Sequence, residues 1–195
     1  MPVRRSGSVK KSKQTALLLI DVINDMEFEG SETLVTLAEA MAKKIRALKG
    51  RARAAGIPTI YINDNFGKWR SDFRATVSYC TKSSVPGHKV AKMLKPDAQD
   101  YFVLKPKQSA FFGTTLDMLL KDLKTKTVIL TGIAGDNCVL FSANDAYLRN
   151  FTVHIPADCV ASNTDAENQY ALQLMKKVVK ADITPSDQLD LEALG

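Results

Sequence analysis

The stretch Ala16-Leu-Leu-Leu-Ile20, followed at once by Asp21, decides the fold class of this chain. All five residues before the aspartate are apolar, which is typical of a central strand covered on both faces of a parallel sheet. Downstream, short apolar runs alternate with amphipathic stretches, the pattern of repeated β-α-β units. We therefore predict an α/β protein with a three-layer α/β/α, Rossmann-like fold around a central, mainly parallel six-stranded sheet.

The other predicted elements follow this first strand in regular alternation. A long helix is expected over residues 31–55, because apolar residues recur there at helical spacing, with Ser31 as its N-cap. Further strands are predicted over residues 57–62, 101–104, 127–131, 151–155 and 181–183. Further helices are predicted over residues 114–123, 138–149 and 165–179. Residues 63–87 show no clear periodicity, and a connection of that length in a compact α/β domain is often a binding segment.

Composition and charge describe one ordinary globular domain behind a basic N-terminal segment. The chain has 195 residues, of which 45% are hydrophobic and 25% are charged. Residues 1–13 hold five of the 27 Lys and Arg residues and no acid, so 22 basic residues face 21 acidic ones in the rest. We predict a disordered basic leader over 1–13, a single domain over 14–184 and a C-terminal tail over 185–195. The basic balance is weak evidence for nucleic acid binding, and no apolar run is long enough to span a membrane.

The three cysteines argue against two common structural roles for this residue. Cys80, Cys138 and Cys159 are an odd number and show no CxxC spacing. They predict neither a disulfide framework nor a structural zinc site. A reducing cytoplasm is therefore the expected location.

Chemically active side chains follow three of the predicted strands. Asp21 ends the first strand, Lys105 follows the third, and Cys138 lies in the turn Gly132-Ile-Ala-Gly-Asp-Asn137 after the fourth or just beyond it. Because the carboxyl ends of parallel strands meet at one edge of the sheet, these three side chains are expected to converge. Taken singly, each has a structural explanation: a turn cap for Asp21, a solvated side chain for Lys105 and a core position for Cys138. Only the presence of all three residues at strand ends predicts a functional site.

The setting of Cys138 predicts nucleophilic chemistry. The first-turn N–H groups of a helix and the ammonium of Lys105 would favour its thiolate. Asp21 could accept the thiol proton and later deliver it to a leaving amine. By contrast, Cys80 and Cys159 have no such partners in the sequence and are expected to be structural.

These residues lie in motifs that resemble a known family. The runs Leu18-Leu-Ile-Asp21-Val-Ile-Asn-Asp25, Val103-Leu-Lys105-Pro-Lys-Gln-Ser-Ala-Phe111 and Thr131-Gly-Ile-Ala-Gly-Asp-Asn-Cys138-Val139 resemble three signatures of the isochorismatase-like cysteine hydrolases. The resemblance covers about residues 14–184. It implies an Asp21–Lys105–Cys138 triad, a non-proline cis peptide bond between Ile133 and Ala134, and an oxyanion hole made by the backbone N–H groups of Ala134 and Cys138. It also implies a homo-oligomer.

Two departures from the family pattern narrow the expected substrate. The stretch Asn63-Asp-Asn-Phe-Gly-Lys-Trp-Arg70 has no histidine where nicotinamidases of this superfamily carry an Asp and two His that bind a metal. We therefore predict neither a metal nor another cofactor, and nicotinamide is disfavoured. The vinyl-ether hydrolases of the superfamily lack the cysteine, so Cys138 favours acyl chemistry. The predicted activity is hydrolysis of a C–N bond in a small amide, ureide or carbamoyl substrate through a thioester.

The loop after the second predicted strand is a candidate for substrate binding. Phe66 and Trp69 could form an apolar wall beside Asn65, and Arg70 could hold a carboxylate or carbonyl group. A surface loop with one anchoring aromatic residue explains the same stretch equally well.

Two other classes of function compete with the enzyme. A catalytically silent interaction module could keep the scaffold and lose the chemistry, although all three triad positions hold competent residues. An RNA-binding protein would rest on the five charges of the leader alone, without aromatic platforms. The expected partner is therefore a small-molecule substrate, with neither nucleic acid nor a membrane.

Overall fold

The computed structural model describes residues 14–67 and 72–194, so the predicted leader over residues 1–13 lies outside the described residues. Its sheet has six strands, in which β3-β2-β1-β4-β5 form a continuous path and β6 pairs with β4. Every strand pair is parallel, and the predicted α/β fold class is confirmed. The strands are β1 (Thr15–Ile20), β2 (Thr59–Asp64), β3 (Tyr101–Lys105), β4 (Thr127–Ile133), β5 (Thr152–His154) and β6 (Val160–Ala161).

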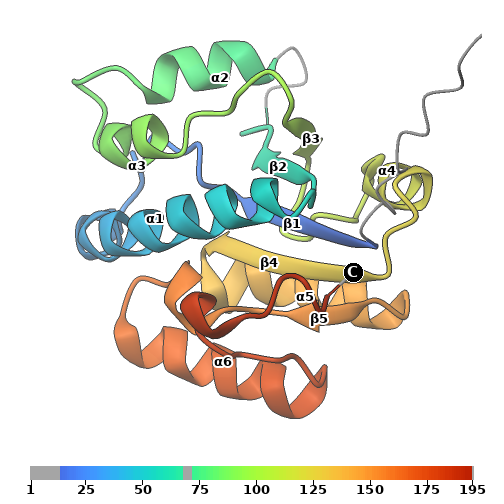
Figure 1. Ribbon diagram of the computed structural model, residues 1–195. Coiled ribbons are helices and arrows are strands. Elements are labelled where there is room, and N and C mark those ends of the chain that lie inside the picture. The colour runs from blue at the N-terminus through green and yellow to red at the C-terminus, as the bar shows by residue number, and fades with distance from the viewer. Residues whose placement is uncertain (1–13, 68–71, 195) are drawn as a thin grey trace, which may run out of the picture.

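Two layers of helices enclose this sheet, with α1 and α6 on opposite sides of β4 (Figure 1). The helices of one layer pack into the same core as Leu17 and Leu19, and those of the other into the core around Leu18. The first layer holds α1 (Ser31–Ala54), α2 (Phe73–Cys80) and α3 (His88–Met93), and the second holds α4 (Leu116–Asp122), α5 (Leu140–Leu148) and α6 (Asp165–Val178).

Strand β1 belongs to both cores because successive side chains of a strand point to opposite faces. Leu17 and Leu19 pack against one layer, whereas Ala16, Leu18 and Ile20 pack against the other. All five are fully buried. Burying one such leucine contributes about 2 kcal/mol, so the run of apolar residues fixes β1 in the centre of the sheet.

Two of the predicted elements are wrong in detail. The N-cap of α1 is Gly30, with φ 79°, whereas Ser31 is the first helical residue and its Oγ donates to the Met26 carbonyl. The short last strand predicted over 181–183 is only an isolated bridge between His154 and Asp182. The sixth strand is Val160–Ala161 instead, which pairs with Gly132 and Ile133 at the end of β4.

The segment after residue 184 packs on the domain that precedes it. Leu189 and Leu191 are buried in the same core as α1. The Arg51 guanidinium donates to the carbonyl groups of Ser186 and Leu189, at 2.6 and 2.5 Å. Asp158 accepts from the Ser186 N–H and hydroxyl at 2.7 and 2.8 Å, so both a charge and an apolar surface hold the segment in place.

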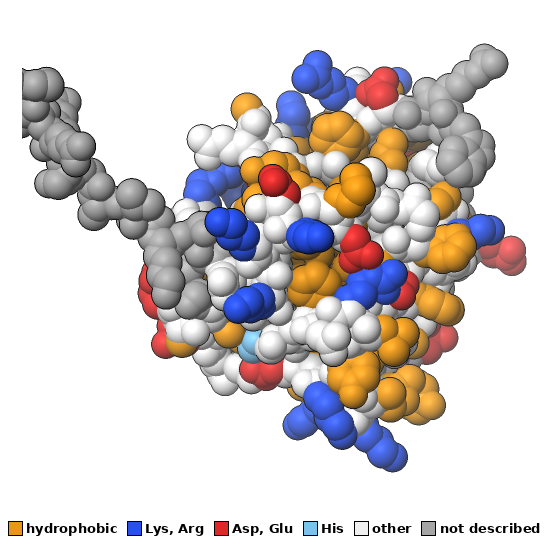
Figure 2. Space-filling view, turned by 90° about the vertical axis from the view of Figure 1, so that its right-hand side faces the viewer, with side chains coloured by type: hydrophobic (Ala, Val, Ile, Leu, Met, Phe, Trp, Pro, Cys, Tyr) orange, Lys and Arg blue, Asp and Glu red, His pale blue; other side chains and the backbone are white. Residues whose placement is uncertain are grey.

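The surface mixes charged and apolar side chains. Figure 2 shows one face on which hydrophobic side chains reach the surface between basic and acidic ones. Phe112, Met118, Phe141 and Leu148 are each more than half exposed. No helix in residues 14–67 and 72–194 has the length and apolar character needed to cross a membrane.

Candidate active site

Four polar side chains meet where β1, β2, β3 and β4 end. Asp21 follows β1, Asp64 and Lys105 are the last residues of β2 and β3, and Cys138 lies in the turn after β4. The predicted convergence of Asp21, Lys105 and Cys138 is therefore present, with Asp64 as an additional member. Sequence reasoning missed Asp64, although its place at a strand end was the same signal that identified the others.

The Lys105 ammonium lies at the centre of this group and is fully buried. Its Nζ lies 2.9 Å from Asp21 Oδ2 and 3.4 Å from both Asp64 Oδ2 and Cys138 Sγ. It also donates to the Lys107 carbonyl at 3.1 Å. An ammonium has three donors, so these contacts use its whole hydrogen-bonding capacity inside the protein.

Contacts with strand β2 hold Asp21 in place at the end of β1. Its backbone is left-handed, with φ 52°, a conformation that aspartate tolerates better than most residues. Its N–H donates to the Ile62 carbonyl at 2.8 Å, and its Oδ1 accepts from the Asp64 N–H at 2.7 Å. The carboxylate is thereby fixed against β2 with its second oxygen directed at Lys105.

A tight turn brings Cys138 to the same place. Gly132 has φ 116°, and the peptide bond between Ile133 and Ala134 is cis. The Ala134 carbonyl then accepts from the N–H groups of Asn137 and Val139, each at 3.1 Å. Cys138 lies within a five-residue π-helical turn, Gly135–Val139, rather than at the start of an α-helix, because α5 begins only at Leu140.

The charges of the three groups influence one another. Burial and, to a smaller extent, the neighbouring Asp21 carboxylate together raise the pKa of Cys138 to about 12, against the opposing effect of Lys105. Burial also raises the pKa of Asp21. Burial by itself would lower the pKa of Lys105, but the charges of Asp21 and Cys138 outweigh it and the pKa is raised. The raised pKa of Cys138 runs opposite to the thiolate stabilisation expected from the sequence, although Lys105 does act in the expected direction.

A cavity of about 370 Å³ opens onto the thiol. This volume suits a small ligand. Phe66 lines the cavity as predicted, whereas Asn65 is not among its lining residues and its Oδ1 instead accepts from the Gly67 N–H at 2.9 Å. Trp69 and Arg70 lie outside the described residues. Wall residues that the sequence did not reveal are Asn24, Phe28, Leu34, Asp64, Asp136, Asn137 and Asn163.

A family model described as the isochorismatase domain matches residues 15–188. The chain belongs to the isochorismatase family. The resemblance inferred from the three sequence motifs is thereby confirmed.

Relatives within the isochorismatase family match nearly the whole chain. An uncharacterised isochorismatase family protein, YaaI of Bacillus subtilis, is 44% identical over 89% of this chain and 95% of its own length. Ureidoacrylate amidohydrolase RutB of Agrobacterium fabrum is 24% identical over 84% of this chain and 86% of its own. The solved structure of N-carbamoylsarcosine amidase from Thermoplasma acidophilum superposes with a TM-score of 0.71, at 27% identity, over 90% and 98% of the two chains.

Metal-binding residues are absent from the described part of this isochorismatase-family chain. In residues 14–67 and 72–194, no three His, Cys, Asp or Glu side chains form a group that could hold a metal ion. His88 and His154 are not among the lining residues of the cavity and make separate contacts, with the Val85 carbonyl and with Asp182. Cys80 and Cys159 are buried, as expected of structural residues.

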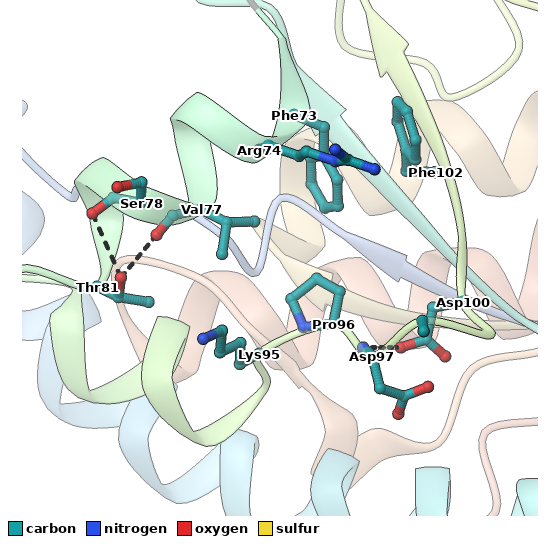
Figure 3. A pocket seen from close by; sticks show the side chains of 11 residues that line it. Phe73, Arg74, Val77, Ser78, Thr81, Lys95, Pro96, Asp97, Asp100 and Phe102 are labelled. Atoms are coloured by element: carbon teal, nitrogen blue, oxygen red, sulfur yellow. Dashed lines mark hydrogen bonds between the residues drawn. The ribbon is translucent and has the colours of Figure 1, made fainter.

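A second cavity, of about 540 Å³ and so larger than the one at Cys138, lies between α2 and the segment before β3 (Figure 3). Phe73 and Phe102 stack at one side of it, with ring centroids 5.0 Å apart. Its carboxylates already have cationic partners, since Asp97 and Asp100 both contact Lys49. Among the described residues, no cysteine lines this cavity, and none lines both it and the cavity at Cys138. The smaller cavity is therefore the candidate active site.

Proposed function

We propose that this protein hydrolyses a C–N bond of a small amide, ureide or carbamoyl substrate through a thioester on Cys138. The observation that carries the proposal is the fully buried ammonium of Lys105, which contacts both the Asp21 carboxylate and the Cys138 thiol. Family relatives named as an amidohydrolase and an amidase support the same reaction class.

The raised pKa of Cys138 assigns the first step to a base. A thiol with a pKa of about 12 carries little thiolate near neutral pH, so the attack requires removal of its proton. Asp21 takes that proton while Sγ attacks the substrate carbonyl carbon. Lys105 stays protonated and stabilises the charge that moves between the carboxylate and the sulfur.

The tetrahedral intermediate then collapses to the thioester. The C–N bond breaks, and protonated Asp21 delivers its proton to the leaving nitrogen. A water molecule next attacks the thioester carbonyl while Asp21 accepts its proton, and Asp21 returns that proton to the sulfur as the C–S bond breaks, which restores the thiol. We assign the oxyanion in both intermediates to the backbone N–H groups of Ala134 and Cys138, on the turn that borders the cavity.

Turnover of a panel of small primary amides, ureides and carbamoyl compounds tests the proposal. Replacing Cys138 by alanine or serine is expected to lower kcat/KM at least about 1,000-fold, because the acyl acceptor is lost. Cys80→Ala is the matched control, since that thiol is buried in the other part of the core and should leave turnover nearly intact. Intact-protein mass spectrometry with a slow substrate should detect the acyl group on the wild type only. Unchanged turnover by Cys138→Ala would show that another group is the nucleophile.

The alternative is a catalytically silent module on the same fold. It predicts that no member of the panel is turned over and that no acyl adduct forms. The close contacts among Asp21, Lys105 and Cys138 speak against it, because an inert site has no need of a buried ammonium between a carboxylate and a thiol.

A further inference from the structure

The described residues that line the cavity at Cys138 carry an excess of negative charge. Asp21, Asp64 and Asp136 all line it. The side chain of Asp64 is 34% exposed, so its carboxylate reaches the space that a substrate would occupy. Its Oδ1 accepts from the Phe66 N–H at 2.5 Å, which fixes its orientation.

Lys105, the one cation that residues 14–67 and 72–194 bring to the site, cannot serve as a partner for a substrate anion. Lys105 is fully buried beneath the wall and spends its donors on Asp21, Asp64, Lys107 and Cys138. Within residues 14–67 and 72–194, no Lys or Arg lines the cavity, and no Lys or Arg forms an ion pair with Asp136. The remaining wall is made of asparagine amides and apolar side chains, which are uncharged.

We infer that this site selects neutral or cationic substrates with N–H donors and rejects those that carry a carboxylate near the scissile bond. Asp64 and Asp136 are the specificity-determining residues. A carboxylate in the cavity would meet two like charges in a partly desolvated space, whereas an N–H donor would find carboxylate acceptors, of which that of Asp64 is already oriented. The inference rests on the proposed function, because it concerns the substrate of that same site.

Two alkylating reagents of nearly equal size, one neutral and one anionic, test this charge selection without a known substrate. Iodoacetamide is neutral and iodoacetate is an anion, and both transfer a two-carbon group to a thiolate with loss of iodide. The rate at Cys138 is measured by peptide mass spectrometry, and the ratio of the two rates is divided by the same ratio for a small neutral thiol in the same buffer. The normalised ratio is expected to favour iodoacetamide about tenfold at low salt and to shrink as salt is added.

Variants assign the effect to the named carboxylates. Asp64→Asn and Asp136→Asn should each bring the normalised ratio several-fold closer to one. Asp64 contacts Lys105, whereas Asp136 does not, so Asp136→Asn keeps the test valid if the Asp64→Asn variant fails to fold. Asp122→Asn makes the same change in net charge on an exposed residue of α4 and should leave the ratio unchanged.

Several outcomes overturn the inference. One is a ratio of one or below in the wild type, and another is a ratio that neither Asn variant alters. A preference for iodoacetate that is lost in Arg70→Gln would favour the predicted carboxylate-binding role of Arg70 instead. The proposed function is judged separately, by turnover. The two substrates to compare are succinamide, which is neutral, and succinamate, which carries a carboxylate. If both are hydrolysed in a reaction that depends on Cys138, but succinamide is hydrolysed no faster, the proposed hydrolase activity is supported and the charge selection is wrong.

Discussion

Cys138, Asp21 and Lys105 form one unit in which the charge of each group alters the proton affinity of the others. The ammonium favours a thiolate, and the carboxylate opposes it. With both neighbours present, burial and the carboxylate prevail, so the pKa of the thiol is raised. In a site of this kind the nucleophile stays neutral until a base removes its proton. Asp21 then has two effects that can be measured separately: its negative charge raises the pKa of the thiol, and its carboxylate accepts the thiol proton.

Asp21→Asn is expected to lower the pKa of Cys138, because it removes a negative charge beside the thiol and leaves the Lys105 ammonium. The pH profile of iodoacetamide alkylation at Cys138 should therefore move to lower pH. Turnover should nevertheless fall at least about 100-fold, because the variant has no base. Asp122→Asn serves as the charge-matched control. A profile that stays in place or moves to higher pH contradicts the coupling, and retained turnover contradicts the role of base.

At the scale of the elements, the site depends on the close approach of β1 and β4. Ile20 pairs with Gly132 in the parallel register of these two strands. A Cβ atom at Gly132 would lie 2.0 Å from the Ile20 carbonyl oxygen, and the φ of 116° is itself unfavourable for an L side chain. The glycine therefore lets β4 end directly beside Asp21 and begin the turn that carries Cys138.

Gly132→Ala is expected to lower the free energy of unfolding by at least about 3 kcal/mol, since the overlap involves backbone atoms that cannot rotate away. Gly50→Ala provides the comparison, because a Cβ there meets nothing within 4 Å inside α1 and should raise stability by about 0.5–1 kcal/mol. Urea denaturation followed by circular dichroism measures both. Equal stability of the Gly132→Ala variant and the wild type would mean that the strands can separate without cost.

At the scale of the whole molecule, we propose that the chain forms a homo-oligomer, as the family resemblance implies. Phe112, Met118, Phe141 and Leu148 leave large apolar side chains exposed on a single chain, and such side chains are commonly covered by another subunit. Size-exclusion chromatography with light scattering should give a mass at a multiple of the single chain, and dilution should shift it downward. A single-chain mass at every concentration contradicts the proposal.

Much of the fold followed from local pattern. The apolar run of β1 and the helical spacing of α1 predict their elements because burial on two faces or on one stripe dictates the residue pattern. Strand β6 has only two residues and pairs with just Gly132 and Ile133, so its sequence resembles a loop. The prediction of Ser31 as the N-cap of α1 is wrong because Ser31 matches the residue preference of that position, whereas Gly30 before it adopts the left-handed conformation and is the N-cap.

The sequence by itself determined the parallel α/β fold and three of the four polar residues at the strand ends, because the positions and ends of the strands follow from local hydrophobic pattern, whereas the order of the strands in the sheet does not. Only the tertiary structure decided how those residues act on one another. Burial is the largest cause of the raised pKa of Cys138, and that burial comes from packing against the core shared with α4, α5 and α6. The cavity wall likewise combines residues from separate parts of the chain, such as Asp64 and Asp136, whose shared negative field exists only once the strands are assembled.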